Sequence, residues 1–113
     1  MTVTFYHNPR CRTSRTALAL LKKQGVEPEI IEYLKTPFSA AELKRILKML
    51  GMSPKELLRP KEAKAAGLMK PGLSDAAIIA GMVEHPIAIE RPIAVSGSRA
   101  VLGRPAEKVL EVL

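Results

Sequence analysis

The first third of the chain constrains the fold most, because strand, helix and strand patterns follow one another there. The stretch "TVTFY" alternates in polarity and predicts a strand at Thr2–Tyr6. "HNP" breaks it, and apolar residues then recur at helical spacing over Thr13–Gln24, before Gly25. "PEIIEYL" predicts a second strand at Glu29–Tyr33. This order is that of a βαβ unit, whose strands lie parallel and are joined by a right-handed crossover.

The middle of the chain predicts a block of helices. Ser39 and Glu42 have the spacing of a capping box, and apolar residues at helical spacing follow as far as Gly51. Three further helices are expected, starting at Ser53-Pro54, spanning Lys61–Ala66, and running from Ser74-Asp75 to Val83 before His85-Pro86.

The end of the chain returns to strands. Pro92–Val95 and Ala100–Leu102 are short β runs joined by four turn-favouring residues, which predicts a hairpin, and a final helix starts at Pro105. A βαβ half followed by a ββα half is the thioredoxin-type arrangement. We therefore expect an α/β, thioredoxin-like fold with a four-stranded mixed sheet. The 113 residues would form a single domain, 1–113, with a helical insertion at roughly 39–84.

Cysteine usage and hydropathy indicate where such a chain works. The single cysteine cannot form an internal disulfide, which favours a reducing compartment, and no secretory signal is evident at the N-terminus. The longest apolar run, Ala76–Val83, is far shorter than the roughly 20 residues that a membrane span needs. We expect a soluble cytoplasmic protein with no membrane partner.

The net charge of +7 suggests an anionic partner: nucleic acid, an acidic protein surface or a small oxyanion. The basic residues are spread along the chain and no aromatic residues interleave with them. Stacking on single-stranded nucleic acid is therefore poorly supported, and nucleic acid is not the expected partner.

Cys11 is the candidate nucleophile. A thiolate is the reactive form of cysteine, and nearby cations or a helix N-terminus lower the pKa of the thiol. Cys11 lies in the turn before the first expected helix, with His7, Arg10, Arg12 and Arg15 close in sequence. A buried, inert cysteine is the alternative, but such a cysteine is normally flanked by apolar residues, whereas "NPRCRTSR" is strongly polar.

Ser14 stands where a C-x-x-C motif would place its second sulfur. Without a resolving thiol, an oxidised Cys11 must borrow a thiol from outside, such as glutathione or a partner protein. Ser14 could donate a hydrogen bond to the thiolate or cap the helix, and the sequence leaves both open.

Three arginines share one local context, since each is followed by proline. Proline stiffens the turn, and an arginine fork on a stiff turn suits bidentate binding of a tetrahedral oxyanion. Pro92 opens the strand that lies beside the active cysteine in a thioredoxin-type fold, so it is also a candidate cis-proline. The three arginines are Arg59, Arg91 and Arg104.

These elements together resemble a known family. "FYHNPRCRTSR", "LLRP", "HPIAIERPIAV" and "LGRPAEKVLEVL" are similar, in order and spacing, to the glutaredoxin-coupled arsenate reductases, a thioredoxin-like family. The resemblance implies that Cys11 is the nucleophile and that His7, Ser14 and Arg15 keep it a thiolate. It also implies that the oxyanion is held by Arg59, Arg91 and Arg104.

The resemblance further implies an oxidoreductase that converts arsenate, or a similar oxyanion, to arsenite. Glutathione would serve as co-substrate and glutaredoxin as partner, with no tightly bound cofactor and no metal, in a monomer. Position 12 is arginine where the well-studied enzymes carry glycine, and we expect this bulky cation to narrow the pocket or to change its preferred anion. The chain has no long tail after the last expected helix, which resembles a short branch of the family. Two alternatives remain: a general glutathione-dependent thiol reductase, and a polymerase-binding regulator. That regulatory use typically goes with a C-x-x-C switch, which Ser14 removes.

Overall fold

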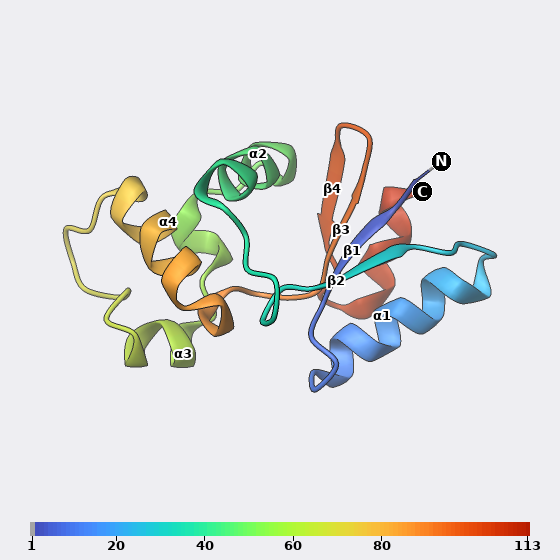
Figure 1. Cartoon of the computed structure of the whole chain (residues 1–113), viewed down its shortest axis with the longest axis horizontal. Helices are drawn as coiled ribbons and strands as arrows, with labels where there is room; N and C mark the ends of the chain where they lie inside the picture. Colours follow the sequence, from blue (N-terminus) through green and yellow to red (C-terminus); the bar gives the residue numbers. More distant parts are fainter. Residues whose placement is uncertain (1) are drawn as a thin grey trace. The chain divides into compact units, whose positions relative to one another are not determined.

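The computed structural model describes residues 2–113, which contain a four-stranded sheet (Figure 1). The strands lie in the order β2-β1-β3-β4; β1 and β2 are parallel, and the other two pairings are antiparallel. The predicted α/β fold with a mixed thioredoxin-like sheet is confirmed. The strands are β1 (Thr4–His7), β2 (Glu29–Glu32), β3 (Ile93–Ser96) and β4 (Arg99–Leu102).

The chain forms two compact units. The sheet unit comprises Met1–Thr36 and Arg91–Leu113, and the helical unit comprises Pro37–Glu90. The helical unit lies between the two halves of the sheet unit in sequence, where the insertion was expected. The prediction that the whole chain is a single domain stays a prediction.

The sheet unit is built around one apolar cluster. Helix α1 (Arg12–Lys23) and the 3-10 helix η3 (Ala106–Val112) flank the sheet in Figure 1 and share this cluster with it. Val3 and Phe5 are two residues apart, so both face these helices. This packing fixes the start of α1 against the ends of the strands. The buried members are Val3, Phe5, Ala17, Leu21, Ala94, Ala106, Val109 and Val112.

Two predictions about the C-terminal part were wrong in detail. The final helix is a 3-10 helix rather than an α-helix. The hairpin turn is also tighter than expected, because Ser96 and Arg99 pair with each other and only Gly97 and Ser98 remain in the turn. Gly97 has a φ of 61°, which suits the first central position of a two-residue hairpin turn.

The helical unit begins its helices with serine caps. Ser39 and Glu42 form the predicted capping box, and a second capping box joins Ser53 to Glu56. Ser74 accepts a hydrogen bond from the Ala77 N–H. The helices are α2 (Ala40–Leu50), η1 (Pro54–Leu57), α3 (Pro60–Ala65), α4 (Asp75–Glu84) and η2 (Pro86–Ala88).

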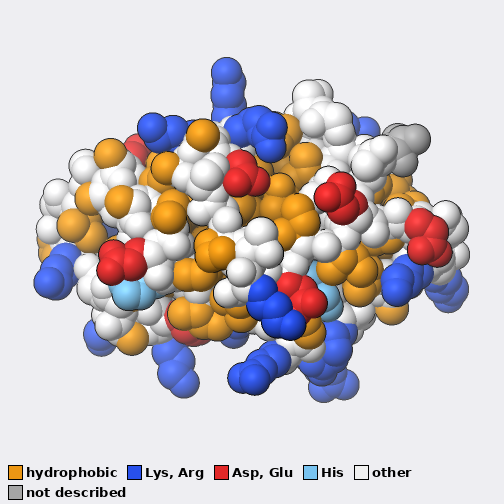
Figure 2. Space-filling model, viewed as in Figure 1, with side chains coloured by type: hydrophobic (Ala, Val, Ile, Leu, Met, Phe, Trp, Pro, Cys, Tyr) orange, Lys and Arg blue, Asp and Glu red, His pale blue; other side chains and the backbone are white. Residues whose placement is uncertain are grey.

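None of the helices within residues 2–113 combines the length and the apolar character needed to cross a membrane. On the face drawn in Figure 2, Lys and Arg side chains are interspersed with hydrophobic and acidic ones and form no single continuous patch. The excess of positive charge on that face is therefore distributed.

Replacing Ser39 with alanine should lower the free energy of unfolding by about 1 kcal/mol, because the capping box loses its side-chain acceptor. Urea denaturation followed by circular dichroism measures the change. Ser98→Ala, at an exposed turn position, is the control. Equal stability of the Ser39 variant and the parent protein would contradict the assigned cap.

Candidate active site

Cys11 is the N-cap residue of α1, in the loop that joins β1 to this helix. Its backbone N–H donates to the carbonyl oxygen of Asn8 at 3.0 Å. The Asn8 side chain accepts from the Arg10 N–H at 3.0 Å, and Arg15 Nη1 donates to the carbonyl oxygen of Pro9 at 2.9 Å. These contacts hold the loop in one compact turn, which presents a half-buried thiol.

The surroundings of Cys11 favour its thiolate. Burial raises the pKa of the Cys11 thiol, but the backbone N–H of Ser14, the guanidinium of Arg91 and the N–H of Thr13 outweigh burial and hold this pKa below its ordinary value. Cys11 is the N-cap residue of α1, so its sulfur faces the N–H groups of the first turn, at the positive end of the helix dipole. These contacts favour the thiolate, the reactive form of cysteine, and the role of Cys11 as the catalytic nucleophile stays a prediction.

Ser14 connects the end of β1 to the first turn of α1. Its hydroxyl is fully buried, lies 2.7 Å from His7 Nδ1 and accepts a hydrogen bond from the Asn8 N–H at 3.1 Å. Ser14 does not cap the helix, because it lies inside the first turn and Cys11 occupies the cap position. Only its backbone N–H is among the groups that lower the pKa of Cys11.

His7 is held in its neutral form. Burial lowers the pKa of His7, the carboxylate of Glu32 raises it, and the positive charges of Arg15 and Lys22 lower it again, leaving it below its ordinary value. A neutral imidazole cannot stabilise a thiolate by charge. Its hydrogen bond goes to the Ser14 hydroxyl, which is not among the groups that lower the pKa of Cys11. The predicted thiolate-stabilising roles of His7, Ser14 and Arg15 stay predictions.

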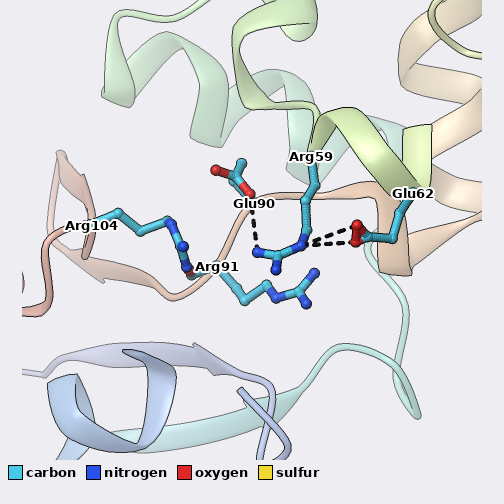
Figure 3. A network of polar contacts seen from close by, with 5 residues as sticks. All are labelled: Arg59, Glu62, Glu90, Arg91 and Arg104. Carbon is cyan, nitrogen blue, oxygen red and sulfur yellow. Dashed lines mark hydrogen bonds and ion pairs between the residues drawn. The ribbon is translucent and has the colours of Figure 1, made fainter. Parts of the chain in front are cut away.

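Arg91 and Arg104 belong to the sheet unit, as Cys11 does. Arg91 is only 7% exposed and its guanidinium acts on the Cys11 sulfur. Arg104 Nη1 donates to the carbonyl oxygen of Arg91 at 3.1 Å, and Figure 3 shows its side chain reaching toward that residue. The peptide bonds before Pro92 and Pro105 are both cis. The sheet unit thus links two of the three arginines named in the sequence analysis and brings Arg91 to the Cys11 sulfur.

Arg59 belongs to the helical unit and is held by two carboxylates there (Figure 3). Its Nε donates to Glu62 at 2.8 Å and its Nη1 to Glu90 at 3.4 Å. These contacts fix the direction of the guanidinium while neutralising part of its charge. The role of Arg59 in binding an oxyanion stays a prediction.

Two open hollows adjoin the Cys11 loop. The Arg12 hollow, of about 440 Å³, is lined by Arg12, Thr13 and Thr16 of α1 and by residues 104–107. The Arg10 hollow, of about 380 Å³, is lined by Asn8, Pro9, Arg10, Glu32, Leu34 and Lys35. Arg10 and Arg12 are exposed, and neither is among the groups within residues 2–113 that lower the pKa of Cys11.

Asn8 and Gly103 support the site but were not among the residues expected from the sequence. Asn8 is 3% exposed and supplies three of the loop's hydrogen bonds, a role that an asparagine before proline in a turn could have signalled. Gly103 donates its N–H to the Pro92 carbonyl at 2.9 Å, and a Cβ there would come within 2.9 Å of Pro92 Cγ. The close approach needs glycine, which only the assembled hairpin reveals.

Arg91→Ala should raise the pKa of Cys11, since it removes a cation and a hydrogen-bond donor from the sulfur. The rate of alkylation by iodoacetamide, measured against pH, should therefore reach its half-maximum at higher pH. Lys23→Ala, an equal loss of charge at the exposed end of α1, should leave the profile in place. Identical profiles for Arg91→Ala and the parent would contradict the role given to Arg91.

Ser14→Ala should lower the free energy of unfolding by about 1–3 kcal/mol, because it leaves buried partners on His7 and Asn8 without their hydroxyl. Chemical denaturation measures the loss. Thr16→Ala, at an exposed position of the same helix, is the matched control. Equal, small losses in both variants would show that the buried hydroxyl contributes little.

Comparison with known proteins shows the family to which the chain belongs. The model of the ArsC family matches residues 6–112. An uncharacterized protein of Escherichia coli (strain K12), YfgD, is 51% identical over 98% of this chain and 96% of its own. An arsenate reductase of Rhizobium meliloti (strain 1021) is 44% identical over 100% of this chain and 82% of its own. The solved structure of an arsenate reductase from Vibrio cholerae superposes with a TM-score of 0.95 at 48% identity, covering 100% of this chain and 98% of that one. The chain therefore belongs to the ArsC family.

Proposed function

We propose that this protein is an arsenate reductase that uses Cys11 as its nucleophile and takes electrons from glutathione and glutaredoxin. The observation that carries the proposal is the activated thiol: backbone N–H groups of α1 and the Arg91 guanidinium together lower the pKa of Cys11. The arsenate reductases among its relatives supply the substrate class.

A group that stabilises the thiolate can also bind the oxyanion that the thiolate attacks. Arsenate is a tetrahedral anion that a guanidinium binds through paired hydrogen bonds. Arg91 lies at the sulfur, and Arg104 is tied to its carbonyl oxygen. We assign these two, with Arg59 of the helical unit, to binding the substrate and to stabilising the charge that develops during attack.

The reaction proceeds by three thiol steps. The Cys11 thiolate attacks arsenic, forms an arsenic–sulfur bond and displaces a hydroxide, which leaves as water after protonation. Glutathione thiolate then attacks the Cys11 sulfur and breaks its bond to arsenic. The electron pair of the arsenic–sulfur bond remains on arsenic, which leaves as trivalent arsenite. Glutaredoxin finally takes the glutathione from the Cys11 mixed disulfide by exchange. Two thiols are oxidised to one disulfide as arsenic gains two electrons.

The need for outside thiols follows from composition. Cys11 is the only cysteine of the chain, so it cannot form an internal disulfide after the transfer. A protein that depends on reduced glutathione works in a reducing compartment, which for this protein is the cytoplasm.

A coupled assay tests the proposal. Arsenate should drive NADPH consumption in the presence of glutathione, glutaredoxin and glutathione reductase, and Cys11→Ser should abolish it. Arg91→Ala should lower kcat/KM for arsenate by about 100-fold, because it removes a charged donor from the transition state. Lys23→Ala, away from the site, serves as the matched control.

A general glutathione-dependent thiol reductase is the second candidate, because an activated lone thiol serves that chemistry equally well. A glutathionylated model disulfide, assayed beside arsenate, separates the two. Turnover of the disulfide with no arsenate-dependent oxidation of NADPH would contradict arsenate reduction and favour the second candidate.

A further inference from the structure

We propose that the Arg10 hollow binds glutathione, which extends the function proposed above by giving its co-substrate a site. This hollow is formed by Glu32 at the end of β2 and by the segments that follow the parallel strands β1 and β2. His7 pairs with Glu32 in the register, so the residues after each strand emerge at the same edge of the sheet. Arg10 directly precedes Cys11 in sequence, so a ligand in the hollow lies beside the nucleophile's loop.

The charges around the hollow match those of glutathione. The tripeptide carries two carboxylates and one ammonium group at neutral pH. The hollow presents two cations, Arg10 and Lys35, and one carboxylate, Glu32. Glu32 and Lys35 form an exposed ion pair with an N···O distance of 3.6 Å. Because water screens this pair, the charged groups of a ligand can replace either partner.

The remaining walls and the size also suit a small peptide. Pro9 and Leu34 provide apolar surface between the charged groups, and Asn8 is fixed by the hydrogen bonds of the loop. A volume of about 380 Å³ falls within the roughly 300–1,000 Å³ of small-molecule sites. The hollow can therefore hold the tripeptide while the charged side chains at its rim bind the two ends.

The Arg12 hollow is the competing location, since it also carries two cations and one carboxylate, namely Arg12, Arg104 and Glu107. Arg104 is tied to the carbonyl oxygen of Arg91 and is assigned to the oxyanion. Glutathione must reach the Cys11 sulfur while arsenic is still attached to it. Glutathione bound in the Arg10 hollow would leave Arg104 available to the oxyanion, which favours this hollow as the glutathione site.

An exchange reaction without arsenate tests this site. Reduced protein reacts with oxidised glutathione: the Cys11 thiolate attacks one sulfur, the disulfide of the reagent breaks, a Cys11–glutathione disulfide forms and one glutathione thiolate leaves. The rate of exchange with oxidised glutathione is divided by the rate of exchange with hydroxyethyl disulfide, which has no charged groups. This ratio measures recognition of glutathione separately from the reactivity of the thiolate.

Arg10→Ala and Lys35→Ala should each lower the ratio by about threefold, and the double variant by about tenfold, as expected for partly exposed ion pairs. The effect should shrink when the glycine carboxylates of the reagent are masked as ethyl esters. Lys23→Ala should leave the ratio unchanged. In the arsenate assay the same two variants should raise KM for glutathione and leave KM for arsenate in place.

An unchanged ratio in the double variant would overturn the proposal. A lower ratio in Arg12→Ala, with an unchanged ratio in the Arg10 and Lys35 variants, would also overturn the proposal and would place the tripeptide in the Arg12 hollow. If the ratio falls as expected while arsenate supports no turnover, the proposed reductase function fails and the glutathione site stands.

Discussion

The contact between Arg91 and the Cys11 sulfur is the interaction on which the site depends. Burial alone would keep Cys11 as an unreactive thiol, because a charged sulfur loses hydration as it leaves water. Two backbone N–H groups of α1 and one guanidinium offset that loss. The fold brings them together by packing α1 on the sheet and by placing Arg91 two residues before β3, the strand that pairs with β1.

The loop before the helix is fixed by polar contacts that do not touch the sulfur. Ser14 bonds to His7 and to the Asn8 backbone, and Arg15 bonds to the Pro9 carbonyl. The positive charge around Cys11 in sequence therefore has different uses. Arg15 stabilises the loop through its hydrogen bond to the Pro9 carbonyl. Arg10 and Arg12 are exposed and line separate hollows in which ligands can bind.

Local features could be predicted from sequence because their causes are local. The capping box at Ser39 and the helix end before Gly25 depend on residues within one turn, and both lie where the sequence indicates. The approach of Arg91 to Cys11 joins residues from opposite ends of the chain, and the close packing of Gly103 on Pro92 needs the folded hairpin. The buried hydroxyl of Ser14 depends on how the loop folds back on His7 and Asn8. Neighbouring residues alone do not define such contacts.

If the proposed mechanism holds, the Cys11 sulfur passes through an arsenic adduct to a glutathione disulfide, and mass spectrometry can follow both products. The reduced protein is mixed with arsenate and glutathione, without glutaredoxin, and intact protein and released arsenite are measured together. The account predicts one glutathione on Cys11 for each arsenite released. Arsenite formed while Cys11 remains a free thiol, or the same adduct forming equally without arsenate, would contradict it.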